Sequence, residues 1–224
     1  MPTMSKSALI VWGGWAGHEP RQVAAVFSRA LTDLGFSVEV VDSLTAFDDY
    51  GKLENLNLIV PVWTMGKIAQ GQLDNVTKAV SKAGVGLAGC HGGMCDSFRE
   101  ATEWQWMTGG QWVAHPGNDG VKYTVKIVHG SSPIVANVGN FEVASEQYLM
   151  HVDPSNKVLA TTGFPVAPGP HEGNGPFEMP VIWTRMHGLG RVFYNSLGHH
   201  ADIVDSEPNL TIMKRGFDWA AKSS

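Results

Sequence analysis

The pattern of hydrophobic and polar residues divides the chain into two halves. In the first half, short apolar runs alternate with segments in which apolar residues recur every three or four positions. Short apolar runs are typical of strands buried on both faces, and the longer spacing is typical of amphipathic helices. The predicted strands are residues 8–12, 36–41, 57–63 and the run beginning at Gly86, and the predicted helices are 20–34, 72–83 and 95–108. This alternation predicts a doubly wound parallel sheet.

In the second half, apolar and polar residues alternate with a period of two, which is typical of antiparallel strands. The candidate strands are residues 123–128, 141–145, 158–161, 181–185 and 191–195. Residues 164–180 hold five prolines without periodicity and predict a loop, whereas 210–222 predict a final helix. We therefore expect an α/β fold with a doubly wound, flavodoxin-like sheet and an antiparallel C-terminal extension, in one domain over residues 1–224.

The sharpest local motif is Gly89-Cys90-His91-Gly92-Gly93, which directly follows a predicted strand. It has the spacing of a nucleophile elbow, in which glycines allow a tight reversal that lifts the central side chain above the sheet. Here the central residue is His91, and imidazole suits proton transfer, metal ligation or hydrogen bonding to a substrate oxygen. We expect His91 in a strained turn, and Cys90 and Cys95 to be dispensable for chemistry.

Ligands of doubly wound sheets bind outside the carboxyl ends of the parallel strands. The loop after the first strand contains Trp15 and His18, the third strand ends at Trp63, and the elbow presents His91. We therefore expect these side chains to be neighbours around one crevice. The first loop lacks the Gly-x-Gly-x-x-Gly spacing of dinucleotide-binding proteins, which argues against a dinucleotide site.

Composition and charge favour a small-molecule partner. Eight tryptophans and nine histidines among 224 residues supply the aromatic faces and imidazoles of which sites for small polar ligands are often built. A net charge of −5 offers no basic stripe for nucleic acid, and no apolar run reaches the roughly 18 residues that span a membrane. The polar N-terminus lacks a secretory pattern, so we expect a cytoplasmic protein; homo-oligomerisation stays open.

Several stretches in order resemble the trehalose-utilisation, or ThuA-like, family, whose fold is similar to that of class I glutamine amidotransferases. The matching stretches are Gly17-His18, residues 89–93, 109–116, 145–148 and 188–199. The resemblance implies a role in handling disaccharides or their keto-sugar derivatives. It does not imply glutaminase activity, because His91 occupies the place of the amidotransferase cysteine.

Together, position and resemblance give a candidate site, a crevice lined by histidines. The catalytic candidates are His91, His199 and Glu146, and the substrate-binding candidates are Trp15, His18, Trp63, His115 and Tyr148. His18, His91 and His199, with Glu146 as a further ligand, are also candidates for holding zinc or manganese, because imidazole and carboxylate suit these ions.

Two classes of function remain open at this point. The first is an enzyme acting on a sugar hydroxyl or carbonyl by acid-base or metal-assisted chemistry, without a covalent cysteine nucleophile. The alternative is a non-catalytic sugar-binding or regulatory protein of the same fold.

Overall fold

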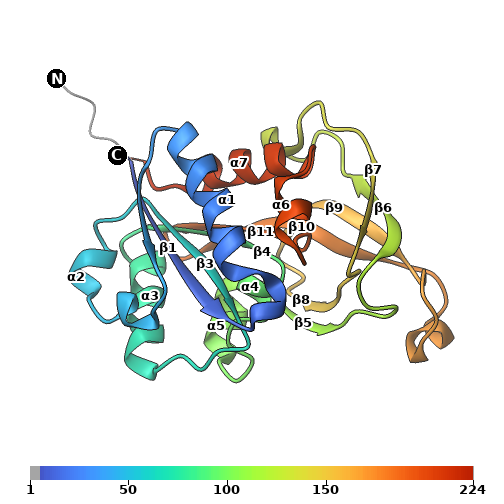
Figure 1. Ribbon diagram of the computed structural model, residues 1–224, viewed down its shortest axis with the longest axis horizontal. Coiled ribbons are helices and arrows are strands. Elements are labelled where there is room, and N and C mark those ends of the chain that lie inside the picture. Colours follow the sequence, from blue (N-terminus) through green and yellow to red (C-terminus); the bar gives the residue numbers. More distant parts are fainter. Residues whose placement is uncertain (1–5, 224) are drawn as a thin grey trace.

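A computed structural model describes residues 6–223, and within that range nine strands form one sheet (Figure 1). Their order is β2-β1-β3-β4-β11-β10-β9-β6-β7. The parallel part consists of β2 (Ser37–Val41), β1 (Ser7–Gly14), β3 (Leu58–Thr64), β4 (Gly86–Cys90) and β11 (Gly190–Asn195). The predicted α/β fold with a doubly wound parallel sheet is confirmed.

The antiparallel part is β10 (Phe177–His187), β9 (Lys157–Phe164), β6 (Val121–Ile127) and β7 (Phe141–Ser145). The predicted antiparallel extension is therefore present. One strand differs from its prediction: β11 is antiparallel to β10 but parallel to β4 on its other side. β11 thus joins the two parts of the sheet, with Asn195 opposite Cys90 of the elbow.

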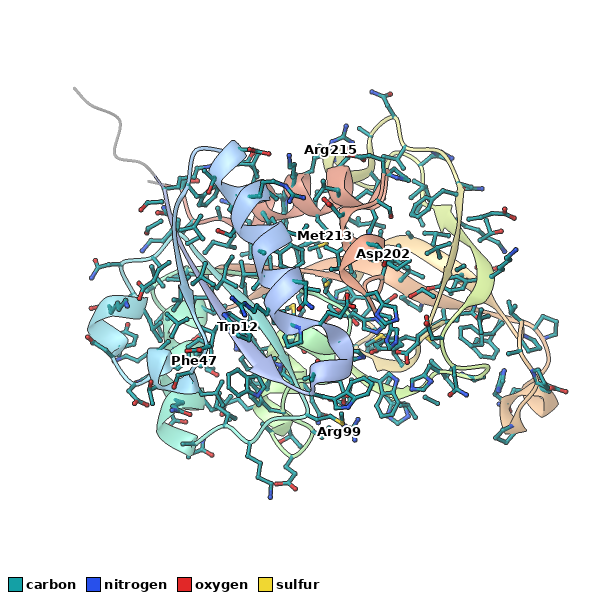
Figure 2. The ribbon with its side chains drawn as sticks, in the orientation of Figure 1. Trp12, Phe47, Arg99, Asp202, Met213 and Arg215 are labelled. Atoms are coloured by element: carbon teal, nitrogen blue, oxygen red, sulfur yellow. The ribbon has the colours of Figure 1, made fainter. Side chains whose placement is uncertain are left out.

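Helices cover both faces of the parallel part. One face carries α1 (Pro20–Asp33), α6 (Ala201–Asp205) and α7 (Asn209–Ala220), and the other carries α2 (Tyr50–Leu53), α3 (Gln70–Ser81) and α5 (Thr102–Thr108) (Figure 1). Since side chains alternate along a strand, Ile10 of β1 belongs to the same core cluster as Met213 of α7, whereas Leu9 belongs to the cluster of Phe47 on the opposite face. Figure 2 labels Met213 and Phe47. No helix among residues 6–223 is both long and apolar enough to cross a bilayer.

The predicted helix over 95–108 is interrupted. The structure has α4 (Gly92–Cys95), a connection over 96–101, and then α5. The break is stabilised because the Ser97 hydroxyl donates to the carbonyls of Gly93 and Met94, and the Trp104 indole N–H also donates to Met94. These donors satisfy carbonyl groups that a helix end leaves free.

Other short elements were absent from the sequence prediction. β5 (Gly110–Ala114) and β8 (Leu149–Val152) pair in a separate two-stranded antiparallel sheet. The predicted loop over 164–180 contains the 3-10 helix η4 (Pro170–Asn174), and β10 begins within it at Phe177. The remaining 3-10 helices outside the site are η2 (Leu44–Phe47) and η3 (Pro133–Val135).

Candidate functional site

His91 stands at a sharp turn between β4, which ends at Cys90, and α4, which begins at Gly92. Its φ of 48° and ψ of −145° are rare for a residue with a side chain, so the elbow prediction is confirmed. Neighbouring β11 holds this backbone in place. The His91 N–H donates to the Asn195 carbonyl at 2.8 Å, and the Tyr194 hydroxyl donates to the His91 carbonyl at 3.2 Å.

His18 approaches the same point from the loop after β1, where it ends the 3-10 helix η1 (Ala16–His18). Its Nδ1 is 2.9 Å from Oγ1 of Thr64, the last residue of β3. The imidazole also passes close to Gly92, where a Cβ atom would lie 2.5 Å from Cε1 of His18. The glycine after His91 therefore leaves the space that His18 occupies.

Glu146 and His199 are supplied by the second half of the chain. Glu146 follows β7, and the hydroxyl of Tyr123 on β6 donates to its backbone carbonyl at 2.9 Å. His199 lies between β11 and α6, directly after Gly198, whose φ is 140°. The side chains of Glu146 and His199 are both buried, so protein groups replace most of the water around them.

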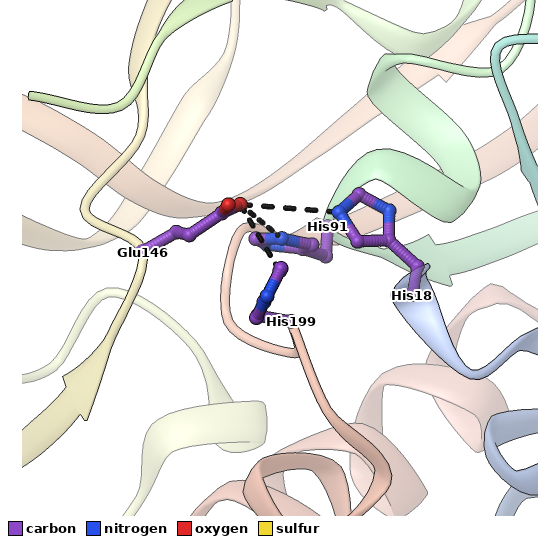
Figure 3. A group of neighbouring side chains, drawn as sticks. All are labelled: His18, His91, Glu146 and His199. Carbon is purple, nitrogen blue, oxygen red and sulfur yellow. Dashed lines mark hydrogen bonds and ion pairs between the residues drawn. The ribbon is translucent and has the colours of Figure 1, made fainter. Parts of the chain in front are cut away.

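The four side chains converge on one point (Figure 3). Oε2 of Glu146 lies 3.1 Å from Nε2 of His91, 3.2 Å from Nδ1 of His199 and 3.9 Å from Nε2 of His18. One ligand atom from each residue lies within 4.8 Å of all the others. The structure thus brings together two histidines from the first half of the chain with a histidine and a carboxylate from the second.

Burial and mutual contact set the charges of this cluster. Burial lowers the pKa of His91 to about 4, although its contacts with Glu146 and Ser196 oppose the shift. Burial alone would raise the pKa of Glu146, but contacts with His18, His199 and His91 outweigh it and hold that pKa well below its usual range. Burial would likewise lower the pKa of His199, yet contact with Glu146 raises it. At neutral pH the centre therefore combines an ionised carboxylate with an uncharged His91.

The donor set fits a divalent metal. The Ser196 carbonyl lies 2.7 Å from Nδ1 of His91 and can only accept, so Nδ1 carries the proton and Nε2 of the neutral ring presents a lone pair. That lone pair faces an ionised oxygen 3.1 Å away, which is repulsive unless a proton or a metal ion lies between them. Two atoms bound tetrahedrally to one zinc at about 2.0–2.1 Å are roughly 3.3 Å apart, close to the contacts of Glu146 with His91 and His199.

A cavity of about 150 Å³ opens beside this cluster. Five of the predicted site residues line it: Trp15, His18, His115, Glu146 and Tyr148. His115 places Nε2 3.6 Å from Oε1 of Glu146, and 29% of its side chain is exposed, more than for any other histidine around this carboxylate. The buried Tyr148 ring stacks on His91 with the ring centroids 3.9 Å apart, so it also fixes the imidazole plane.

Trp63 does not join the other predicted residues, and we correct that expectation. Trp63 is not among the residues that line the cavity in the described part of the chain. Its ring lies instead against Gly13 and Gly66, so closely that a Cβ atom at these glycines would be 2.6 and 2.3 Å from the ring. The reason is strand alternation. Thr64 is the residue whose side chain reaches His18, so the preceding residue of β3 points to the opposite side.

Comparison with known proteins identifies the family. A sequence model of the ThuA family, described as trehalose utilisation, matches residues 7–220. The chain belongs to the ThuA family. None of the curated proteins compared with it matches the sequence.

Solved structures show the fold that this ThuA-family protein shares. A ThuA-like protein from Bacteroides uniformis is 16% identical with a TM-score of 0.75, and the match covers 98% of this chain and 94% of that chain. A Salmonella typhimurium protein described as cytoplasmic is 12% identical, with a TM-score of 0.67 over 97% and 100%. A glutamine amidotransferase from Thermotoga maritima is 9% identical, with a TM-score of 0.55 over 87% and 76%. The predicted likeness to amidotransferases is confirmed for the fold.

In this ThuA-family protein, Cys90 of the elbow and Cys95, which ends α4, are enclosed by the rest of the fold. Both are free and buried, and burial raises the pKa of the Cys90 thiol to about 12 and that of Cys95 still further. A thiol reacts as a nucleophile through its thiolate form, which these surroundings disfavour. Among residues 89–93, the His91 imidazole is thus the only side chain suited to proton transfer or metal binding at neutral pH.

Five residues near the cavity were missed by sequence reasoning. They are Thr64, which contacts His18, and four residues of the cavity wall, Met65, Asp96, Arg99 and Trp112. Thr64 ends an apolar strand at the ligand edge, which was a usable signal. Asp96 and Arg99 fall in the segment that was predicted as continuous helix, and the interruption of that helix is what turns them towards the cavity.

Proposed function

We propose that this ThuA-family protein is an enzyme of sugar utilisation that changes a hydroxyl or carbonyl group of a disaccharide or its keto-sugar derivative. His18, His91, Glu146 and His199 would hold one divalent metal, zinc or manganese. The observation that carries the proposal is the close approach of an uncharged His91 Nε2 to an ionised Glu146 oxygen, 3.1 Å apart, in a buried cluster. The family description supports trehalose or a derivative as the substrate.

The bound metal would supply Lewis acidity, which polarises a carbonyl or lowers the pKa of a hydroxyl. Residues of the chain provide the rest. His115 lies on the cavity side of Glu146, 3.6 Å from Oε1, where it can exchange a proton with a bound sugar. Trp15, with 45% of its surface exposed, offers an aromatic face on which a sugar ring can stack. The buried, unreactive Cys90 argues against a covalent acyl intermediate and so against glutaminase chemistry.

The proposal includes a cytoplasmic location. It is supported by the Salmonella typhimurium protein of the same fold, which is described as cytoplasmic.

The test combines metal analysis with turnover. Chelator-treated protein is reloaded with zinc or manganese, its metal content is measured, and conversion of trehalose and 3-keto-trehalose is followed by NMR. We expect one metal ion per chain and metal-dependent conversion of at least one sugar. In His91→Ala, loss of a ligand should abolish metal retention and lower the rate by about 10²-fold or more.

His129→Ala is the matched control, because His129 is exposed and outside the cluster. It should keep both the metal and the activity. Sugar binding without conversion under either metal would instead identify a non-catalytic sugar-binding protein. Failure to retain metal in the wild-type protein would contradict the metal-assisted mechanism, whatever its activity.

A further inference from the structure

The cavity has a second polar feature besides the metal-ligand cluster, formed by Asp96 and Arg99. Asp96 directly follows α4 and is only 3% exposed. Arg99 donates from Nε and Nη2 to the two carboxylate oxygens of Asp96, at 2.6 and 2.8 Å. Both residues line the same cavity as Glu146, and Figure 2 labels Arg99 at the lower side of the molecule, where β1 and β3 end.

The guanidinium group of Arg99 is held from two directions. The paired hydrogen bonds to Asp96 fix its plane, and its carbon Cζ lies 4.6 Å from the ring centroid of Trp112. Gln111 donates a further hydrogen bond to Asp96 at 3.3 Å and so helps to fix the carboxylate. Of the five N–H groups of an arginine, two are used by Asp96, which leaves the Nη1 pair and one on Nη2. With 45% of the side chain exposed, these donors are available to a ligand.

The net charge of the Asp96–Arg99 ion pair determines which ligand charges it favours. A free arginine at a binding site favours carboxylates and phosphates, because it pairs with them through two parallel hydrogen bonds. Here that fork is already occupied by a buried aspartate, so the pair is neutral as a whole. A ligand carboxylate could reach only the remaining Nη1 and Nη2 edge of the guanidinium, where it would approach the negative charge of Asp96. Uncharged hydroxyl and carbonyl oxygens can accept hydrogen bonds from the remaining N–H groups of Arg99 without this repulsion.

We infer that Asp96 sets the charge preference at the Arg99 side of the cavity, holding Arg99 as a hydrogen-bond donor for an uncharged sugar and disfavouring sugar acids there. This inference rests on the proposed function, since it assumes that the cavity binds a sugar. Asp96 is a specificity-determining residue that acts through Arg99, and Arg99 is the one that contacts the sugar. The inference adds to the proposed function that the part of the sugar next to Arg99 carries no carboxylate.

The test compares glucose with glucuronate, two pyranoses that differ by an oxidised carbon, as ligands of the zinc-loaded protein. Dissociation constants are measured by NMR titration for wild type, Asp96→Asn and Arg99→Lys. Asp96→Asn keeps the side-chain shape but leaves the arginine charge unbalanced, so the glucuronate-to-glucose ratio of dissociation constants should fall about tenfold. Arg99→Lys keeps the positive charge but loses the fork, so glucose binding should weaken several-fold with no shift towards glucuronate.

The outcomes separate this inference from the proposed function. If glucose binds and the ratio in a folded, zinc-retaining Asp96→Asn stays within twofold of wild type, the inference is overturned while the proposed function stands. If Asp96→Asn does not fold, Arg99→Lys decides, and unchanged glucose affinity there overturns the inference. If neither sugar binds the zinc-loaded wild type, the sugar site itself is wrong and both proposals fall.

Discussion

Two of the three imidazoles in the cluster, those of His91 and His18, are each oriented by a residue that does not itself reach the centre. The Ser196 carbonyl accepts a hydrogen bond from Nδ1–H of His91, and the Thr64 hydroxyl lies 2.9 Å from Nδ1 of His18. Coordination through Nε2 of His18 requires the proton on Nδ1, where Thr64 can accept it. Such outer contacts fix the ring and its tautomer before a metal arrives.

Thr64→Val should therefore weaken metal binding. Valine keeps the shape of threonine but removes the acceptor, so we expect the dissociation constant for zinc to rise about 10- to 100-fold. Competition with a fluorescent chelator would measure it. Thr77→Val is the matched control, since the Thr77 hydroxyl is buried and has no hydrogen-bond partner among residues 6–223. Equal zinc affinity in the two variants would show that Thr64 does not position His18.

For single residues, the sequence predicted that histidines would meet at the site, but not always which of two adjacent residues in a strand points towards it. His18 and His91 were placed correctly because both follow strand ends at the ligand edge. Trp63 was placed incorrectly because consecutive side chains of a strand point to opposite sides, and the end of β3 could not be located to one residue. Glu146, His115 and His199 were found only through the family resemblance.

Among the elements, the turn between β4 and α4 carries the tightest constraint. It places His91 in a strained conformation and also passes within contact distance of His18. Two requirements therefore fall on two consecutive residues: His91 must hold its imidazole above the sheet, and Gly92 must leave room for that of His18.

Gly92→Ala should disrupt the site without unfolding the protein. The added methyl would lie 2.5 Å from a His18 ring atom, so the imidazole has to move and zinc affinity should fall by tenfold or more. Isothermal titration with zinc measures this. Gly71→Ala provides the control, because a Cβ there meets no atom within 4 Å and alanine favours the helix α3. Zinc affinity in Gly92→Ala equal to that of the control would contradict the close packing.

The connection between β8 and β9 gives a pH-dependent prediction away from the cluster. Asp153 accepts hydrogen bonds from the Ser155 hydroxyl and N–H and pairs with the mostly buried Arg185 of β10, and these contacts lower the pKa of Asp153 to about 2. A lowered pKa means that its stabilisation is complete above pH 4 and is lost as the pH falls towards 2. Asp153→Asn should thus cost about 1 kcal/mol at pH 5 and progressively less below pH 4.

Urea unfolding of wild type and Asp153→Asn across this range would measure the difference in free energy. A difference that stays constant from pH 5 to pH 2.5 would rule out a contribution from the ionised carboxylate.

The elements were predictable where a long apolar run or a clear helical repeat decided the structure, as for β1, β3 and α1. They were not where chain-distant partners decided it. β5 and β8 are stabilised mainly by pairing with each other, and the break between α4 and α5 depends on hydrogen bonds from Ser97 and Trp104. No periodicity in the sequence encodes those contacts.

For the whole molecule, metal binding should be coupled to folding. The four proposed ligands lie on separate segments of the chain, and they come together only when the sheet is complete. Zinc at about 100 times its dissociation constant should then stabilise the native state by about 2.7 kcal/mol and raise Tm by roughly 5–10 °C. Calorimetry with zinc and with chelator measures the shift, and His199→Ala should show little of it. An equal shift in His199→Ala would mean that zinc binds elsewhere.

The position of β11 between β4 and β10 also has a consequence for synthesis on the ribosome. Until residues 190–195 have emerged, β4 lacks its partner on that side, and the carbonyl of Asn195 is not there to hold the elbow. An emerging chain therefore exposes an unpaired apolar strand while about 100 further residues are added, from the end of β4 at Cys90 to the start of β11 at Gly190, and chaperones protect edges of this kind. Because the last of the four ligands follows this strand, a metal ion captured during translation would meet an incomplete cage. If the proposed metal site is correct, loading would thus be a late event, confined to chains that are almost finished.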